Sequence, residues 1–589
     1  MKLSQLRVKN FRTIGAGDSG NGVSINIDNN IIFILGKNNA GKSSLLNAYD
    51  VFVSNTQITE NDFFNKDLSL EVEIEMQLKA DSDEERQLDV FSQAGITSIK
   101  KTWKFCEGVI ERSTFRLLGE EWLNVDDKDK KGKDKIKRLE QEFPETIWIR
   151  GMETSEDVVS KLKKLVQKSV LQTLKDTQTY KQAQEAVQKL QEMVSYSETS
   201  ASISISISQI IQEVFPAISL NIDSYSNDID LIKMIQDDTK FMIQENDLPV
   251  TYDMQGHGVQ RQLIFSTLKV YSKQLKNANS NTKSPIQLDN ITATQASGKK
   301  YMILLEEPEL FLHPTAIRSI RNLLYDLAKN SEFQFMCATH SPVIIDLNQS
   351  KSSLVRVVKV PDKGSVAHQL QSEELINPRM LEEFNSHVCE AFFADRVILV
   401  EGSTEVVAIK CLLDKIKKES EACTGLSDFH IVNCGGKTTI PGFQKILRLF
   451  RIDYFVFHDS DSPKDTSGRK LNVWTINDKI WDEIEAARKS QVDAKRFVSI
   501  VDFESANGYN PYPKGKPSVA YDQVRKWVSR WDDDTVQSKP IVKYLMSLVD
   551  EKYEIEDHTS EWLHKQNIED VSEDFLDEQL ELDFERFCN

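Results

Sequence analysis

One short segment near the start of the chain restricts the fold more than any other. Gly36–Ser43 has the sequence GKNNAGKS, a complete G-x-x-x-x-G-K-[ST] phosphate loop, between an apolar run at 31–35 and a helical pattern at 44–52. A tight turn between a strand and a helix points backbone N–H groups at a phosphate, at the positive end of the helix dipole. The segment therefore predicts an α/β fold that binds a nucleoside triphosphate.

The side chains of this loop predict how the nucleotide is held. Lys42 is placed to neutralise the β- and γ-phosphates, and the hydroxyl of Ser43 is placed to hold Mg²⁺. A glycine-rich strand–helix turn without a ligand is the alternative, which the complete motif disfavours. The residues expected to contact the nucleotide here are Gly36, Asn38, Asn39, Ala40, Gly41, Lys42, Ser43 and Ser44.

Length and composition indicate a multi-domain globular protein. At 589 residues the chain is too long for a single hydrophobic core. No apolar run is long enough to cross a bilayer, and the alternating N-terminus lacks the apolar core of a signal peptide. The seven cysteines include no C-x-x-C pair, so we expect thiols in a reducing cytoplasm and no structural zinc.

Charge is distributed unevenly along the chain. The net charge is −18, and residues 550–589 hold 15 Asp and Glu against 3 Lys and Arg. Because nucleic-acid binding depends on local patches, the acidic total does not exclude it. The basic segments at 128–138 and 161–168 are candidates for such a patch, with a solvated surface as the alternative.

Hydrophobic periodicity divides the first half of the chain. From 155 to 195 apolar residues recur at helical spacing, which predicts a two-helix insertion whose apolar stripe packs on the domain body or on another subunit. Strict Ser–Ile alternation at 200–208 predicts a strand with one buried face. Period-two alternation predicts further strands, of which the first two form a hairpin-like edge, at 3–9, 23–27, 70–78 and 99–105.

The second half of the chain alternates strands and helices. Residues 277–300 are polar and aperiodic and predict an exposed loop, and 350–390 is mixed and is expected to join two domains. From 519 the chain is predicted to be helical and acidic. Short apolar runs predict strands of buried sheets at 301–305, 333–338, 396–400, 430–433 and 454–458.

Two adjacent carboxylates directly follow the apolar run at 301–305. Glu306 can hold the Mg²⁺ shell and Glu307 can polarise the attacking water, which is the arrangement of a Walker B element. His340 follows the next apolar run, where it can contact the γ-phosphate, although a structural histidine is an alternative. A glycine-bearing loop at 255–261 precedes an amphipathic helix.

In this order the motifs resemble those of the ATP-binding-cassette ATPases of the SMC and RecF type. The resemblance rests on Asn10-Phe11-Arg12, the phosphate loop, the glycine loop, LLEEPELFLHP and ATHSP. It implies two ATP molecules held between two ATPase heads, so that a chain with one head must dimerise. Gly258 would contact the partner's nucleotide, although the loop departs from the usual LSGGQ.

A second group of carboxylates follows strands in the last third of the chain. The run at 396–400 ends at Glu401, with Glu405 four residues later, and the run at 454–458 ends at Asp459-Ser460-Asp461. Between them, Cys434-Gly435-Gly436-Lys437 follows another strand. Carboxylates at neighbouring parallel strand ends share one cleft and suit Mg²⁺ or Mn²⁺, which can activate water at a phosphodiester. Separate solvated carboxylates are the alternative for any single residue.

This ordered set resembles a Toprim domain, the metal-dependent fold of topoisomerases, primases and some nucleases. The resemblance implies that Glu401 is a general acid or base and also a metal ligand, and that Asp459 and Asp461 bind metal. Glu405 corresponds to an extra carboxylate of the nuclease branch.

Two later segments extend the resemblance. Ser499–Glu504 is similar to the strand that supplies a second metal ligand, for which Glu504 is preferred over Asp502. Lys539, in VQSKPIVKYL, is placed like a lysine that stabilises transition-state charge, with a surface lysine as the alternative.

An ATPase head at 1–385 followed by a Toprim domain at 390–589, with an acidic helical C-terminus, is the layout of the OLD (overcoming lysogenization defect) nuclease family. Within that family the chain is similar to the Gabija nuclease subunit and to OLD effectors of retrons. The resemblance implies DNA as substrate, ATP and Mg²⁺ (Mg²⁺ or Mn²⁺ at the Toprim site) as cofactors, and a homodimer or larger homo-oligomer with 155–195 as a contact. A helicase, or a retron reverse transcriptase with its msDNA, would be the partner, without a membrane.

The prediction is therefore an ATP-regulated, metal-dependent DNA endonuclease in anti-phage defence. One alternative is a topoisomerase-like or primase-like Toprim enzyme, but no tyrosine stands in a recognisable strand-passage context. Another is an ATPase scaffold whose Toprim domain is not catalytic, which the intact Glu401, Asp459 and Asp461 disfavour.

Overall fold

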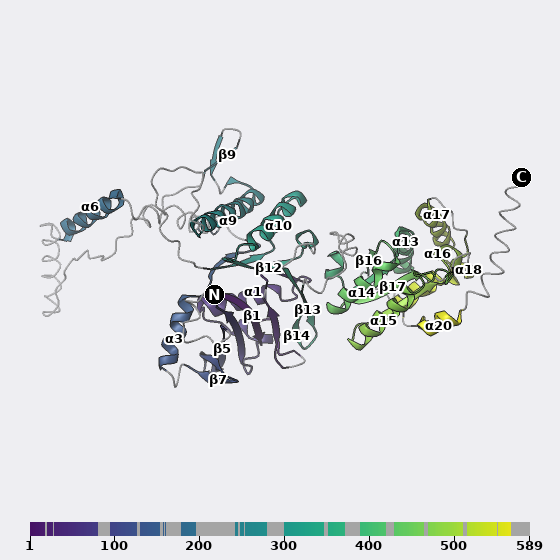
Figure 1. The fold of residues 1–589 in the computed structure, drawn as a ribbon, viewed down its shortest axis with the longest axis horizontal. Helices are drawn as coiled ribbons and strands as arrows, with labels where there is room; N and C mark the ends of the chain where they lie inside the picture. The colour runs from purple at the N-terminus through teal and green to yellow at the C-terminus, as the bar shows by residue number, and fades with distance from the viewer. Residues whose placement is uncertain are drawn as a thin grey trace, which may run out of the picture. The chain divides into compact units, whose positions relative to one another are not determined.

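The computed structural model describes most of the chain (Figure 1). Its contacts divide the chain into two compact units. One unit comprises Met1–Pro144, Leu304–Glu309 and Gln334–Asn589, and the other comprises Glu145–Ile303 and Leu310–Phe333. The described residues are 1–17, 20–27, 29–80, 95–125, 130–152, 157, 160, 178–195, 242–245, 248–251, 254–279, 300–346, 352–371, 389–419, 429–464, 469, 471–509, 515–550 and 552–566.

The first unit begins with an antiparallel sheet of strand order β2-β1-β4-β5-β6-β7. Alternate residues of β4 are fully buried, so one face of the sheet is packed and the other is partly solvated. The strands predicted from period-two alternation are confirmed, including the antiparallel pair of β1 and β2 at the sheet edge. The bounds are β1 (Lys2–Lys9), β2 (Val23–Asn26), β4 (Val72–Lys79), β5 (Ile96–Cys106), β6 (Val109–Leu118) and β7 (Glu121–Asn124), and helix α3 (Lys130–Gln141) follows.

A second sheet carries the phosphate loop. In the first unit its order is β14-β13-β3-β12-β11, and β3 pairs in parallel with both β12 and β13. Every residue of β3 and β12 is buried, as their apolar runs predicted. The bounds are β3 (Ile31–Leu35), α1 (Lys42–Ser54), β11 (Tyr301–Glu306), β12 (Phe333–Thr339), β13 (Ser352–Val360) and β14 (Gly364–Gln371).

Strands β13 and β14 correct one expectation. The mixed segment at 350–390 was expected to join two domains, but 352–371 forms an antiparallel hairpin within the phosphate-loop sheet. Its first strand, SSLVRVVKV, has six consecutive buried residues, including Ser353 and Arg356. Buried polar residues interrupt the run of apolar residues by which a buried strand is recognised in a sequence, so this strand was not predicted.

The described residues of the second unit are mostly helical. Helix α6 lies within the predicted insertion at 155–195, whose first predicted helix, like the predicted strand at 200–208, lies outside the described residues. Helix α9 continues to Asn279, three residues into the loop predicted at 277–300, of which 280–299 are not described. The bounds are β8 (Glu145–Ile149), α6 (Gln178–Ser195), β9 (Met242–Glu245), β10 (Leu248–Thr251), α9 (His257–Asn279) and α10 (Pro314–Ala328).

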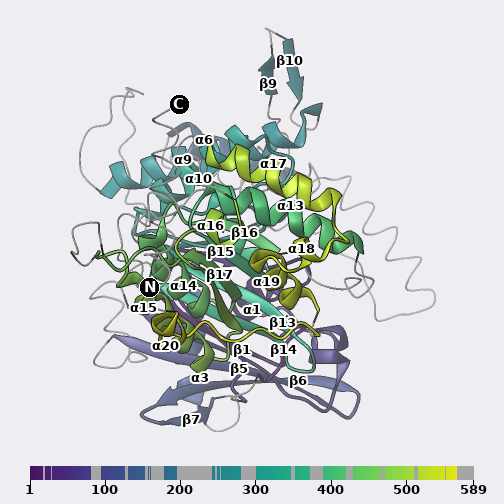
Figure 2. The same ribbon diagram turned by 90° about the vertical axis from the view of Figure 1, so that its right-hand side faces the viewer.

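The C-terminal part of the first unit is a parallel sheet of order β16-β15-β17-β18 with helices around it. Figure 2 shows α13 and α17 side by side, and both contribute to the apolar core of this part. The bounds are β15 (Arg396–Val400), α13 (Ser403–Glu419), β16 (Phe429–Asn433), α14 (Ile440–Leu449), β17 (Asp453–Asp459), α15 (Ile476–Lys489), β18 (Ala494–Ser499), α16 (Phe503–Ala506), α17 (Lys516–Ser529), α18 (Asp534–Gln537), α19 (Pro540–Val549) and α20 (Ser560–Lys565).

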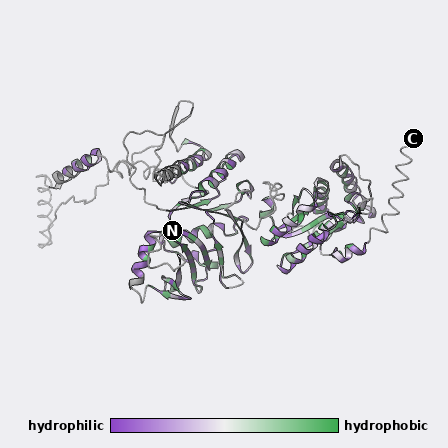
Figure 3. Ribbon diagram, in the orientation of Figure 1, coloured by the Kyte–Doolittle hydropathy of each residue, from purple (hydrophilic) through white to green (hydrophobic). Residues whose placement is uncertain are grey.

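The predicted βα alternation from 396 is thereby confirmed, as is the helical character of the chain after 519 up to residue 565. Figure 3 shows hydrophobic residues gathered along the strands and hydrophilic ones on helices such as α3 and α15. In the part of the chain that the structure describes, no helix is both long and apolar enough to span a membrane.

Candidate functional site

The phosphate loop turns sharply between β3 and α1, and the backbone requires two of its glycines. Gly36 has a φ of 150° and Gly41 a φ of 106°. A Cβ atom on Gly36 would lie 2.3 Å from the carbonyl oxygen of Val357, and one on Gly41 would lie 2.2 Å from Ser365 Oγ. Among the described residues, no side chain caps the N-terminus of α1. No described side chain therefore blocks an anion at this helix end, where the N–H of Ser44 donates to the carbonyl oxygen of Gly41.

Lys42 lies inside the loop with its ammonium group enclosed. Its Nζ donates to the carbonyl oxygens of Gly36 and Lys37, both at 2.9 Å, and lies 2.6 Å from His340 Nε2. Burial lowers the pKa of Lys42 to about 8, against the opposing effect of nearby glutamates. Burial and the charge of Lys42 lower the pKa of His340 to about 4, so the imidazole is neutral at pH 7 and accepts from the lysine.

The two Walker B carboxylates reach the same place from the end of β11. Ser43 Oγ donates to Glu306 Oε1, although the two residues are 263 positions apart. Glu307 adopts a left-handed backbone with a φ of 46°, and its Oε1 lies 3.5 Å from His340 Nε2. The serine and the first glutamate are thus paired where a Mg²⁺ ion would be held, and the second glutamate lies beside the histidine.

Sequence analysis missed a further carboxylate, Glu309. It is largely buried, and its Oε1 accepts 2.8 Å hydrogen bonds from Thr339 Oγ1 and from the backbone N–H of His340. Burial raises the pKa of Glu309. Glu309 therefore fixes the end of β12 and with it the position of His340. Its place in Glu306-Glu307-Pro308-Glu309 was visible, but the Walker B pattern assigns no role to the last residue.

The glycine loop belongs to the second unit. Gly258 lies in the first turn of α9, where an added Cβ would come 3.2 Å from the carbonyl oxygen of Phe311. The ring of His257 stacks on Phe311, with centroids 5.1 Å apart. The predicted contact of Gly258 with a nucleotide stays a prediction. A cavity of about 240 Å³ adjoins the loop and is lined by Ile149, Arg150, Gly151, Met152, His257, Gln260, Arg261, Ile264 and Phe311.

The second group of carboxylates gathers at the carboxyl ends of the C-terminal parallel strands. Glu401 follows β15, and Asp459 ends β17, which pairs in parallel with β15. Asp461 lies two residues further on, with a left-handed φ of 56°. Glu405 is buried in the first turn of α13, where its Oε2 accepts from the N–H of Gly402.

A third parallel strand, β18, leads to the remaining predicted metal ligand. Glu504 lies in the short helix α16 and is only 3 % exposed. Asp502 instead caps that helix, because its Oδ1 accepts from the N–H of Ser505 at 2.7 Å. Asp502 thus caps the helix while its charge also acts on Asp459, and Glu504 faces Glu405 and Lys516, so the preference for Glu504 stays a prediction.

Electrostatics show that these carboxylates are close enough to affect one another. Burial raises the pKa of Glu401 to about 7, with smaller effects from Lys437, Asp461 and Glu405. Burial raises the pKa of Asp459 well above its usual value, and the charges of Glu401 and Glu405 act in the same direction. Glu405 has a raised pKa for the same first reason, aided by Glu504.

The carboxylate oxygens of this cluster are suitable ligands for a cation. Glu401 Oε1 and Asp459 Oδ1 are buried oxygens without a hydrogen-bond partner. Such oxygens are costly unless a positive charge satisfies them. Across the residues that the structure describes, no three acidic, histidine or cysteine side chains already enclose an ion position, so the side chains would have to turn to complete a site.

Two of the described lysines, Lys437 and Lys516, contact carboxylates of the cluster, whereas the predicted Lys539 contacts a backbone carbonyl and an aromatic ring. Lys539 Nζ donates to the carbonyl oxygen of Asn507 at 2.7 Å and lies 4.7 Å from the ring centre of Trp527. Lys516 Nζ lies 3.2 Å from Glu504 Oε1. The predicted role of Lys539 stays a prediction, whereas Lys516 contacts a predicted ligand directly.

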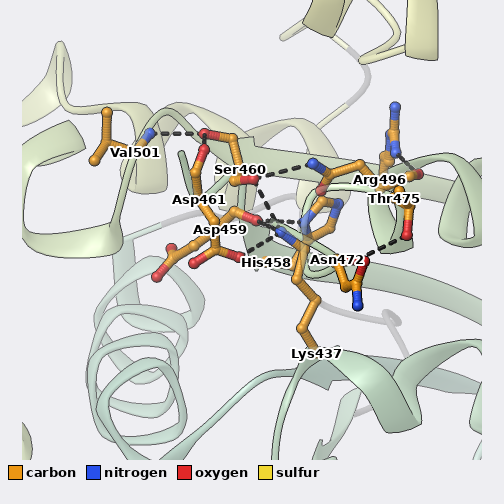
Figure 4. A network of polar contacts seen from close by, with 10 residues as sticks. Lys437, His458, Asp459, Ser460, Asp461, Asn472, Thr475, Arg496 and Val501 are labelled. Carbon is orange, nitrogen blue, oxygen red and sulfur yellow. Dashed lines mark hydrogen bonds and ion pairs between the residues drawn. The ribbon is translucent and has the colours of Figure 1, made fainter. Parts of the chain in front are cut away.

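Lys437 is the other lysine in contact with the cluster. Its Nζ donates to the carbonyl oxygens of Asp459 and Ser460 and pairs with Asp461 Oδ2 (Figure 4). Sequence analysis noted the glycine pair before Lys437, but it predicted no contact for the lysine side chain.

Comparisons with known proteins match both predicted domains. The family model for the AAA ATPase domain (AAA_15) matches residues 1–345, and the model for the overcoming lysogenization defect protein-like TOPRIM domain matches 392–461. The chain is an AAA-family ATPase with an OLD-like TOPRIM domain. These domains together imply the use of a nucleotide and of a divalent metal.

The AAA-family chain also resembles curated proteins. It is 23 % identical over 489 residues to the Old nuclease of Escherichia phage P2, covering 78 % of this chain and 77 % of that protein. It is 23 % identical over 507 residues to the endonuclease GajA of Bacillus cereus strain VD045, covering 80 % and 76 %. The OLD nuclease of Thermus scotoductus is 27 % identical over 264 residues, which cover 44 % of this chain and only 42 % of that protein.

Among solved structures, an SMC head bound to the C-terminal winged helix of ScpA superposes with a TM-score of 0.34 at 12 % identity, covering 63 % of this chain and 98 % of that chain. The SMC head domain of Thermotoga maritima gives a TM-score of 0.31 at 11 % identity, covering 63 % and 100 %.

Proposed function

We propose that this AAA-family protein is an ATP-regulated, metal-dependent DNA endonuclease that acts in anti-phage defence. The observation that carries the proposal is the pair of buried, partnerless carboxylate oxygens on Glu401 and Asp459, at the ends of two neighbouring parallel strands. A phosphate loop in the same chain supplies the ATPase. The names of the OLD and GajA relatives support this assignment.

The residues of the Toprim cluster would have different roles in phosphodiester cleavage. A divalent ion, when bound, would lower the pKa of a bound water molecule and would stabilise the negative charge on the leaving oxygen. Asp459 and Asp461 would hold such an ion, and Glu405 and Glu504 would hold a second. Glu401, whose pKa is raised to about 7 by burial, can accept or release a proton near neutral pH. Mg²⁺ and Mn²⁺ both suit these oxygen ligands.

The residues of the ATP site have separate tasks. Lys42 would transfer its hydrogen bonds from the loop carbonyls and His340 to the β- and γ-phosphates. Ser43 and Glu306, already paired, would hold Mg²⁺, and Glu307 would polarise the attacking water. His340 lies within 3.5 Å of Glu307 and can register the γ-phosphate.

We further propose the assembly and setting of the enzyme. Because the chain has one phosphate loop, a second ATPase head would be needed to enclose the nucleotide. Gly258 of one subunit would then contact the nucleotide of the other, so we expect a homodimer or a larger homo-oligomer. The division into an ATPase domain at 1–385 and a Toprim domain at 390–589 is part of the same proposal. Action on phage DNA would take place in the cytoplasm, together with a helicase or with a retron reverse transcriptase and its msDNA.

The test compares DNA cleavage and ATP hydrolysis on the same preparations. Supercoiled plasmid is incubated with wild type, Asp459→Ala and Lys42→Ala, with Mg²⁺ or Mn²⁺ and with or without ATP, and products are separated on a gel. Metal-dependent linear or nicked DNA that disappears in Asp459→Ala supports an endonuclease. Relaxed, closed circles would support the topoisomerase-like alternative, and unchanged plasmid with intact ATP hydrolysis would support the scaffold.

A further inference from the structure

Lys437 stands out because it is a lysine enclosed in an acidic cluster. It begins a short 3-10 helix, Lys437–Thr439, directly after Gly435 and Gly436, which have positive φ values of 68° and 134°. The Lys437 side chain is only 4 % exposed. A buried ammonium group is costly unless acceptors surround it, so its position demands a specific set of partners.

The partners of Lys437 all come from one three-residue turn. Its Nζ lies 2.5 Å from the carbonyl oxygen of Asp459, 3.0 Å from that of Ser460 and 2.7 Å from Asp461 Oδ2. A lysine has three N–H donors, and each has one acceptor here. The ammonium group thus contacts every residue of the Asp459–Asp461 turn (Figure 4), which backbone hydrogen bonds to Ser499 and Val501 also hold.

The three contacts differ in how easily they can be exchanged. The two carbonyl oxygens belong to the backbone and stay with the turn. The Asp461 carboxylate belongs to a side chain that is 39 % exposed, so it can rotate toward a new partner. The unpartnered Asp459 Oδ1 is in the same turn, and a cation shared by both aspartates would satisfy both carboxylates.

We propose that Lys437 is a positioning residue that acts as a resident counter-ion. It holds the Asp459–Asp461 turn in the metal-free protein and gives up Asp461 when a divalent cation binds. This inference rests on the proposed function, because it takes Asp459 and Asp461 as metal ligands. Lys437 keeps its two carbonyl contacts in both states, so the turn is preformed but the bound metal always has a positive neighbour.

This role predicts a specific effect of removing the charge. Without Lys437, the metal no longer competes for Asp461 and no longer meets a positive charge a few ångströms away. We therefore expect Lys437→Met to bind Mn²⁺ roughly tenfold more tightly or better than wild type, while the metal-free protein loses stability. Removing a purely structural lysine would destabilise the metal-free and metal-bound proteins alike and leave Mn²⁺ affinity unchanged.

The chain offers a matched control in Lys101. Its side chain is 1 % exposed, and its Nζ donates to Phe52 O at 2.8 Å, Asn55 Oδ1 at 2.7 Å and Glu140 Oε1 at 2.6 Å. It is therefore another buried lysine with three acceptors and an ion pair, on β5 of the antiparallel sheet. Lys101→Met should lower the melting temperature without changing the response to metal.

The experiment measures thermal unfolding of the full-length protein without nucleotide, in EDTA and in MnCl₂, with Mn²⁺ affinity from calorimetry. Mn²⁺ should raise the melting temperature of wild type and Lys101→Met equally, and that of Lys437→Met by more. Asp459→Asn should abolish the rise, which places the ion in this cluster. Lys437→Gln, which keeps hydrogen-bond donors but loses the charge, should behave like Lys437→Met and decides the result if the methionine variant does not fold.

Three results would overturn the inference: an equal or smaller Mn²⁺ response in the uncharged variants, no response in wild type, or a response that survives Asp459→Asn. Plasmid cleavage is recorded in parallel and is a separate readout. A wild-type protein that binds Mn²⁺ as expected but cuts no DNA would refute the proposed nuclease and still support the role of Lys437.

Discussion

Lys42 Nζ lies 2.6 Å from His340 Nε2, so the phosphate-loop lysine and the histidine after β12 form a hydrogen bond across the sheet edge. Both groups have lowered pKa values, chiefly because of burial. The neutral histidine accepts from the ammonium group, which also satisfies two loop carbonyls. The donors of Lys42 are therefore satisfied within the protein, and we expect the ammonium group to exchange these acceptors for phosphate oxygens when a nucleotide binds.

The first prediction concerns Lys42. Lys42→Ala should reduce ATP hydrolysis about a hundredfold or more, because it removes the charge that meets the phosphates at the moment of transfer. Lys37→Ala is the control, since Lys37 is in the same loop but its Nζ pairs with Asp395 at 2.5 Å. Phosphate release should stay near the wild-type rate in the control. Wild-type hydrolysis by Lys42→Ala would show that the loop is not the ATP site.

The second prediction concerns Glu307. Glu307→Gln should still bind ATP, because the amide has nearly the shape of the carboxylate, but it should not hydrolyse ATP, because it cannot polarise water. ATP should then accumulate in a closed, larger assembly, visible as a rise in mass by light scattering. An unchanged mass on adding ATP, with the nucleotide bound, would contradict the sandwich of two heads.

The third prediction separates the two activities. Glu401→Ala, Asp459→Ala and Asp461→Ala should each lose DNA cleavage and keep ATP hydrolysis, because each removes charge from the Toprim cluster alone. Glu504→Ala should weaken metal binding and be partly rescued by excess Mn²⁺. Asp453→Asn is the control, because Asp453 begins β17, at the opposite end of the strand from Asp459. It should cleave like wild type, and loss of both activities in any variant would indicate misfolding.

The fourth prediction concerns acid stability and His558. This ring is 4 % exposed, and its Nδ1 accepts from the N–H of Val498 at 2.9 Å, so it must stay unprotonated there. Burial and Arg496 lower its pKa to about 4 from an ordinary 6.5. Between those values the unfolded chain binds the proton and the folded one does not, so the free energy of unfolding falls as pH drops from about 6.5 to about 4.

The variant His558→Asn isolates this contribution. Asn places an acceptor oxygen near the position of Nδ1 but does not titrate, so between pH 7.5 and 5.0 it should lose about 2 kcal/mol less unfolding free energy than wild type. Urea unfolding at the two pH values measures the difference. His368 and His458 also have lowered pKa values, so part of the acid sensitivity should remain. Equal losses in both proteins would refute the role of His558.

Several features of the sites followed from pattern alone. Ser43 and Glu306 are 263 positions apart, yet their meeting was predicted, because the carboxyl ends of parallel strands share one edge of a sheet. The same rule brought Glu401 and Asp459 together from strands β15 and β17. Such meetings are predictable because the carboxyl ends of parallel strands lie at one edge of the sheet, and a side chain next to a strand end can reach only a small region there.

The parts that could not be predicted involve long side chains and buried polar residues. Nothing in GGK indicates that Lys437 reaches the Asp459–Asp461 turn 22 to 24 positions away, because a lysine can extend in many directions. For the same reason, the sequence did not show that Lys516 contacts the carboxylate of Glu504 whereas Lys539 contacts the backbone of Asn507. Strand β13 was missed because Ser353 and Arg356 are buried in it.

The sequence by itself determined the two chemistries of this protein, since a phosphate loop, a Walker B pair and the Toprim carboxylates are each defined by residue type and spacing next to an apolar strand. Only the tertiary structure decided which polar groups meet. It paired Lys42 with His340, gave Glu309 the end of β12, and enclosed Lys437 among the acids. Those contacts depend on burial and on the directions of side chains from distant segments, which no local pattern encodes.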